Sequence, residues 1–121
     1  MRVTGLALAV VLVASLSACA QDYSTPEELS KLMESKAAPY ILVDVRTAEE
    51  FGSGHIPTAV NIPYDAIVDK APTQDKNALI VVYCRTGSRS NAAQQALKKA
   101  GYTNVVNFGG IAKWKGPVVK P

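Results

Sequence analysis

The chain has 121 residues, which is room for one domain of ordinary size. Apolar residues make up 48% of it and charged residues 19%, a balance typical of a folded globular protein and not of a disordered one. The formal net charge of +3 comes without a long basic run and with few aromatic residues, so nucleic acid is not expected as a partner.

Residues 1–20 are predicted to be a signal peptide and not part of the fold. Arg2 supplies a minimal positive charge, Leu6–Leu16 is an apolar core, and small residues follow it. This apolar core is too short for a comfortable membrane span. The rest of the chain, residues 21–121, is then expected to form a single domain.

Two cleavage sites fit this signal. Ala18-Cys19-Ala20 matches the small-x-small pattern and would place the cut after Ala20. Leu16-Ser17-Ala18-Cys19 is similar to the box of bacterial lipoproteins, in which cleavage before Cys19 leaves that cysteine lipidated. The second match is the more specific and is favoured. Either site predicts export to the bacterial cell envelope, as a periplasmic protein that is soluble or held at the membrane only by a lipid anchor.

The first predicted elements after the signal are a helix and a strand. The helix is expected to begin after Thr25, whose side chain would cap it, with Pro26 in the first turn and Glu28 completing a capping box. It should run to about Ser35. The nearly continuous apolar run Ile41–Val45 is typical of a strand that is covered on both faces.

Helices and strands are expected to alternate along the rest of the chain. In order they are a short helix at Thr47–Phe51, a strand at Ala59–Ile62, a helical turn at Tyr64–Asp69, a strand at Leu79–Tyr83, a helix at Ser90–Ala100, a strand at Val105–Phe108 and a short helix around Trp114. Gly101 is expected to end the longest of these helices. The alternation predicts an α/β fold, an open and mainly parallel sheet with helices on both faces.

Cys84 follows the most apolar predicted strand and precedes a helix. In open α/β sheets, ligands bind at this carboxyl edge of the strands. Arg85, Arg89, the loop amides and the helix N-terminus would all stabilise a thiolate, so the pKa of Cys84 is expected below the free value of roughly 8.5. The same groups would bind an anion. The loop therefore predicts a reactive thiolate inside an anion-binding site.

The chain carries three recognisable stretches: LVDVRTAEEFGSGHIPTAVNIP at residues 42–63, IVVYCRTGSRSNAAQQAL at residues 80–97 and GYTNVVNFGGIAKWKG at residues 101–116. They resemble the rhodanese family of sulfurtransferases, over nearly all of Tyr23–Lys115. LVDVRTAEEFGSGHIPTAVNIP, residues 42–63, is similar to the family's D-x-R…E-[FY]…G-H-I-P-x-A-x-N-[IL]-P signature. IVVYCRTGSRSNAAQQAL, residues 80–97, is similar to its active-site loop and the helix behind it. GYTNVVNFGGIAKWKG, residues 101–116, resembles its closing strand, Gly-Gly turn and Trp-bearing helix. Thr58 stands where the family most often has glycine, and little consequence is expected.

The resemblance implies a role for each residue of the loop. Cys84 would be the nucleophile that takes a sulfane sulfur, as a persulfide, from thiosulfate or a similar small anionic donor. An acceptor such as cyanide, a thiol or a thioredoxin-like protein would then remove the sulfur. The residues that would hold the persulfide and the donor are Arg85, Thr86, Gly87, Ser88, Arg89 and Ser90. Asp44, Arg46 and His55 would be structural residues near the site.

Two other functions remain open. Phosphatases and arsenate reductases with a related fold space their cysteine and arginine as Cys-x5-Arg, whereas Cys84 and Arg89 are spaced Cys-x4-Arg. A shorter loop suits a sulfur atom better than a phosphoryl group, and this loop offers no general acid. The second possible function is that of a non-catalytic module that binds anions or a protein. The intact cysteine argues against this function. No metal cluster or nucleotide loop stands out, so no metal and no cofactor are expected. A monomer is expected.

Overall fold

The structure is a computed structural model that describes residues 22–36 and 38–121. The predicted signal peptide, its two cleavage sites and the lipidation of Cys19 lie outside the described residues. The elements are α1 (Pro26–Ser35), β1 (Ile41–Asp44), α2 (Ala48–Gly52), β2 (Val60–Asn61), the 3-10 turn η2 (Tyr64–Ala66), β3 (Ile80–Cys84), α3 (Ser88–Lys99), β4 (Val105–Gly110) and the 3-10 turn η3 (Ile111–Lys113).

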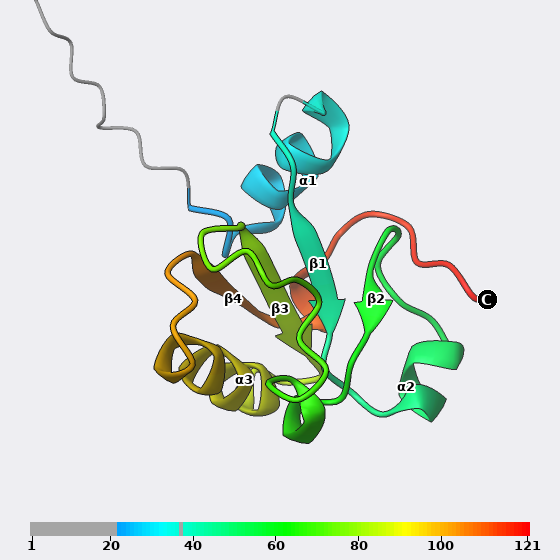
Figure 1. The fold of residues 1–121 in the computed structure, drawn as a ribbon. Coiled ribbons are helices and arrows are strands. Elements are labelled where there is room, and N and C mark those ends of the chain that lie inside the picture. The colour runs from blue at the N-terminus through cyan, green and yellow to red at the C-terminus, as the bar shows by residue number, and fades with distance from the viewer. Residues whose placement is uncertain (1–21, 37) are drawn as a thin grey trace, which may run out of the picture.

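The four strands form one parallel sheet in the order β2-β1-β3-β4 (Figure 1). β1 and β3 lie at its centre, with Asp44 opposite Tyr83 in the last pair of their register. Because all strands are parallel, their carboxyl ends meet at one edge of the sheet, and Cys84 lies at that edge. The predicted open parallel sheet is confirmed.

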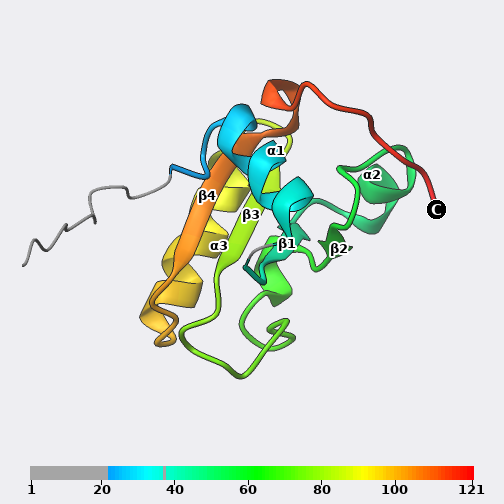
Figure 2. The same cartoon turned by 90° about the horizontal axis from the view of Figure 1, so that it is seen from above.

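Helices cover both faces of the sheet, as predicted (Figure 2). Side chains alternate along β3, as they must in a strand: Val82 and Cys84 belong to the hydrophobic cluster that includes α3, while Val81 and Tyr83 belong to the cluster that includes α1. Every residue of β3 is fully buried. This explains why its sequence is continuously apolar, and it directs Cys84 to the same face as α3.

The long helix α3 begins two residues earlier than predicted. Gly87 precedes it with a φ of +108°, in a region that favours glycine, and this turn lets helical geometry start at Ser88. The predicted C-terminal signal is correct: Gly101 has a φ of +103° and its N–H donates to Lys98 O, while the N–H of Tyr102 donates to Leu97 O. This pattern is the Schellman motif.

Three other features differ from the prediction, besides shifts of one residue at the ends of several elements. Thr25 caps α1, but its own N–H donates to the carbonyl of Asp22, so the capping box predicted with Glu28 is not closed. β4 includes the two glycines expected to follow it, because after a bulge Gly109 and Gly110 pair with the end of β3. The short helices predicted at Tyr64–Asp69 and around Trp114 are the single 3-10 turns η2 and η3.

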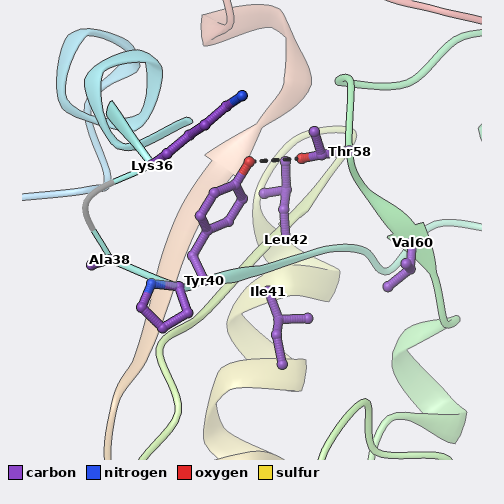
Figure 3. A pocket seen from close by; sticks show the side chains of 8 residues that line it. Lys36, Ala38, Tyr40, Ile41, Leu42, Thr58 and Val60 are labelled. Atoms are coloured by element: carbon purple, nitrogen blue, oxygen red, sulfur yellow. Dashed lines mark hydrogen bonds between the residues drawn. The ribbon is translucent and has the colours of Figure 1, made fainter. Parts of the chain in front are cut away.

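Thr58 has a φ of +74°, so the position favours the glycine that the family resemblance predicts there. A residue with a β-carbon costs roughly 1–2 kcal/mol in this conformation. The Thr58 Oγ1 lies 3.1 Å from the hydroxyl of Tyr40, in a hollow of about 590 Å³ at the amino end of β1 (Figure 3). The departure from glycine therefore strains the backbone. That it has little consequence for function stays a prediction.

Candidate active site

The sulfur of Cys84 lies at the centre of a set of hydrogen-bond donors. Sγ accepts the backbone N–H groups of Gly87, at 3.0 Å, and of Ser90, at 3.3 Å. In the thiol form S–H donates to the Ser90 hydroxyl, 3.4 Å away, and that hydroxyl donates to the carbonyl of Gly87 at 3.1 Å. Cys84 and Ser90 are both fully buried. The loop therefore folds around the sulfur atom.

The pKa of the Cys84 thiol is set by two opposing effects. Burial raises it, but hydrogen bonds from the side chain and amide of Ser90 and from the amides of Gly87 and Thr86 outweigh burial and hold the pKa below its ordinary value. The predicted direction is therefore correct. The predicted cause is correct for the loop amides but incomplete, because the Ser90 hydroxyl lowers this pKa most and the charges of Arg85 and Arg89 are not among its leading causes.

Removal of the Ser90 hydroxyl should raise the pKa of Cys84. Ser90→Ala keeps the backbone donor but loses the side-chain donor, which lowers the pKa most. The midpoint of the alkylation rate against pH should move up toward the value of a free thiol, roughly 8.5. The wild-type thiolate forms at lower pH, so the variant should lose most reactivity near neutral pH. Ser88→Ala, at an exposed position of the same turn, is the control. Equal midpoints in all three proteins would contradict the role of Ser90.

The remaining residues of the predicted loop differ in exposure and in their partners. Arg85, Thr86 and Ser88 are exposed, and Arg85 forms no ion pair with any residue that the structure describes. Arg89 is partly buried and is directed to a partner outside the loop. Its Nη1 and Nη2 donate to the two carboxylate oxygens of Glu50, at 2.8 Å and 3.0 Å. Sequence reasoning missed Glu50, although it is the glutamate of the signature quoted above.

The end of β4 supports the loop from behind. Gly110 lies so close to it that an added β-carbon would be 2.7 Å from the carbonyl oxygen of Arg85 and 3.2 Å from the α-carbon of Thr86. Both of these are backbone atoms, which cannot swing aside as a side chain would. The absence of a side chain at Gly110, the last residue of β4, thus permits a close approach between strand and loop.

Asp44 and Arg46 form a buried ion pair at the carboxyl end of β1. Nη2 of Arg46 donates to Asp44 Oδ2 at 2.6 Å and to the carbonyl of Gly54 at 2.7 Å. Asp44 Oδ2 also accepts the hydroxyl of Tyr83 at 3.0 Å, and that hydroxyl accepts the N–H of Ile56. Burial raises the pKa of Tyr83, which keeps it protonated as a donor. This network joins the ends of β1 and β3 to the segment before β2.

Asp44→Asn should destabilise the protein by about 3 kcal/mol, because the neutral side chain leaves the charge of Arg46 buried without a counter-ion. Arg46 is only 6% exposed and Asp44 is fully buried, so water cannot replace the lost partner. Urea unfolding at neutral pH measures the change. Asp65→Asn, at an exposed position in η2, should change stability by less than about 0.5 kcal/mol. A loss below about 1 kcal/mol for Asp44→Asn would contradict the importance of this pair.

His55 is occupied by contacts away from the sulfur. Its Nδ1 lies 2.9 Å from the carbonyl of Phe51, and its ring stacks on the Phe51 ring with centroids 3.6 Å apart. Its backbone pairs with Val119. These contacts favour the structural role expected of His55 over a catalytic one.

No three histidine, cysteine, aspartate or glutamate side chains of residues 22–36 and 38–121 are grouped so that they could hold a metal ion. None of the helices described is long and apolar enough to cross a membrane.

The chain is similar to known proteins over most of its length. Residues 25–117 match the model of the rhodanese-like domain. The thiosulfate sulfurtransferase PspE of Escherichia coli is 38% identical over 80 residues, which cover 64% of this chain and 77% of PspE. A sulfurtransferase of Allochromatium vinosum is 39% identical over 85 residues, 67% of this chain and 79% of that protein.

A solved structure described as a rhodanese with anions from E. coli superimposes with a TM-score of 0.60 at 36% identity. The match covers 69% of this chain and all of that one. The family model spans well over half of the sequence, and the matched region contains the Cys84 loop and every strand of the sheet. The chain therefore belongs to the family of rhodanese-like domains and is a sulfurtransferase of that family.

Proposed function

We propose that the protein moves a sulfane sulfur from thiosulfate to a thiophilic acceptor through a persulfide on Cys84. The Cys84 thiolate attacks the outer sulfur of thiosulfate and forms a sulfur–sulfur bond. The bond between the two sulfur atoms of thiosulfate breaks, and its electron pair leaves with sulfite. An acceptor thiolate or cyanide then attacks the outer sulfur of the persulfide, which restores the Cys84 thiolate and releases an acceptor persulfide or thiocyanate.

The observation that carries this proposal is the convergence of donors on the Cys84 sulfur. Two backbone N–H groups and the Ser90 hydroxyl surround it, and fixed donors of this kind stabilise negative charge without reorganising during the reaction. These donors stabilise the negative charge of both the thiolate and the persulfide. The hydroxyl would rotate from the Gly87 carbonyl to the sulfur when the proton of the thiol leaves.

We propose thiosulfate as the donor for two reasons. The relative PspE is named a thiosulfate sulfurtransferase, and the similar E. coli structure is described with anions. In this chain Cys84 is fully buried, and the exposed residues of its loop are Arg85, Thr86 and Ser88, past which a donor would enter. A guanidinium at this entrance suits the oxygens of a small dianion.

The intact mass of the protein after incubation with thiosulfate tests the proposal. The mass should rise by one sulfur atom, and cyanide or a small thiol should remove that sulfur again. Sulfite should appear in an amount equal to the sulfur bound. If the mass does not change with thiosulfate but rises with an organic persulfide, sulfur transfer through Cys84 stands and the assignment of thiosulfate as the donor fails.

We further propose that the protein is exported, because Leu6–Leu16 followed by small residues is typical of a secretory signal. The same mass measurement checks this on protein recovered from the envelope of a bacterial host. Cleavage after Ala20 gives a chain that starts at Gln21, and cleavage before Cys19 gives a heavier, lipidated chain. A full-length chain in the cytoplasm would contradict export.

A further inference from the structure

Glu50 is a charged residue beside the sulfur-binding loop that the mechanism above does not use. Its two carboxylate oxygens accept two parallel hydrogen bonds from the guanidinium of Arg89, the geometry that gives the strongest pairs of this kind. The two side chains are 26% and 28% exposed, so water screens the pair only in part. The contact joins the first turn of α2 to the first turn of α3.

The Glu50 carboxylate is also fixed by its own helix. Oε1 accepts the backbone N–H and the hydroxyl of Thr47, both at 3.1 Å, and the Thr47 hydroxyl oxygen accepts the N–H of Glu50. This is a complete capping box. The Arg89 guanidinium lowers the pKa of Glu50 to about 2, with smaller help from Thr47. Glu50 therefore carries its full negative charge at any physiological pH.

Arg89, the partner of this charge, lies within electrostatic reach of the reactive sulfur. Arg89 directly precedes Ser90, which supplies a backbone and a side-chain hydrogen-bond partner to Cys84. The hydrogen bond with Glu50 is the largest cause that raises the pKa of Arg89. The charge of Cys84 raises this pKa further. The guanidinium of Arg46 is neutralised by its ion pair with Asp44. Arg85 and Arg89 thus bring two positive charges to the loop, and Glu50 cancels one.

We propose that Glu50 is a specificity-determining residue, which by pairing with Arg89 leaves one net positive charge at the loop and shifts selectivity from the thiosulfate dianion toward singly charged sulfane-sulfur donors. Organic thiosulfonates and organic persulfides are donors of this class. The proposal rests on the sulfur-transfer function proposed above. Its physical basis is that the carboxylate repels a doubly charged donor about twice as strongly as a singly charged one.

Glu50→Gln tests this with little change of shape, because glutamine also completes a capping box. The ratio of kcat/KM for thiosulfate to kcat/KM for benzenethiosulfonate should rise about five- to tenfold in the variant, as expected when one negative charge next to Arg89 is removed. The gain should shrink at high salt. Glu49→Gln is the matched control, since Glu49 is the exposed neighbour on the same helix turn, and its ratio should stay at the wild-type value.

A ratio that does not move in Glu50→Gln, with kcat/KM lowered equally for both donors, would overturn the proposal, because Glu50 would then only position Arg89. Arg89→Gln is a second variant with the opposite expectation. It leaves Glu50 charged and removes the cation, so the ratio should fall below that of the wild type. A rise in this variant would also overturn the proposal.

Alkylation of Cys84 gives a readout that does not depend on sulfur transfer. The rate with iodoacetate, which is an anion, divided by the rate with iodoacetamide, which is neutral, should rise several-fold in Glu50→Gln and stay constant in Glu49→Gln. If this ratio rises but neither donor loads sulfur onto the wild type, the proposed function fails and the electrostatic effect of Glu50 stands. If sulfur loads but neither ratio changes, the function stands and the role of Glu50 is wrong.

Discussion

Cys84→Ser should abolish sulfur transfer. The substitution replaces a thiolate by a hydroxyl that stays protonated at neutral pH, so the attack on the donor loses its nucleophile. We expect turnover with thiosulfate and cyanide to fall by at least about three orders of magnitude. The intact mass should no longer rise after incubation with thiosulfate. The serine fits the volume of the cysteine, and the N–H groups of Gly87 and Ser90 can bond its oxygen.

The thermal midpoint of Cys84→Ser is the control, because a folded but inactive variant places the loss in the chemistry and not in the fold. Activity with aryl phosphates should be negligible in both the variant and the wild type. A serine variant that keeps more than a trace of transfer would show that another group accepts the sulfur. Hydrolysis of aryl phosphates by the wild type at a rate above sulfur transfer would favour the Cys-x5-Arg enzymes as the better analogy.

The position of the reactive cysteine could be predicted because each step depends on local sequence. The apolar run before Cys84 is long enough to mark a buried strand, and the alternation of strands and helices makes the sheet parallel. The carboxyl edge then follows from the topology. The predicted start of α3 at Ser90 was wrong, because the sequence does not show that Gly87 adopts a positive φ and brings Ser88 into the helix.

Contacts between distant residues were the part that could not be predicted. Glu50 and Arg89 are 39 residues apart, and nothing in the sequence says whether Glu49 or Glu50 faces the loop. The backbone donors to Cys84 have no sequence signature either, since any residue except proline supplies an N–H. The lowered pKa was therefore ascribed to the loop amides and helix N-terminus in general, together with Arg85 and Arg89. The sequence did not indicate that the Ser90 hydroxyl is the donor that lowers it most.

Gly110→Ala should slow sulfur transfer strongly without unfolding the protein. The new methyl group would lie 2.7 Å from the carbonyl oxygen of Arg85, closer than such atoms pack, so the loop backbone must shift. The φ of Gly110 is −91°, which alanine adopts freely, so the change tests the contact and not backbone strain. A shift of about 1 Å in groups that stabilise a reacting atom costs on the order of a hundredfold in rate. We expect that loss in kcat/KM for thiosulfate.

Gly52→Ala is the matched control, because a β-carbon there meets no atom within 4 Å. It should keep wild-type activity and gain up to about 1 kcal/mol of stability through the reduced entropy of the unfolded chain. In Gly110→Ala the alkylation midpoint of Cys84 should also rise, since a displaced loop weakens the hydrogen bonds that lower its pKa. A Gly110→Ala protein that transfers sulfur at the wild-type rate would mean that the loop can move without cost. The donors around Cys84 would then not need the fixed positions on which the proposed stabilisation of the thiolate and persulfide depends.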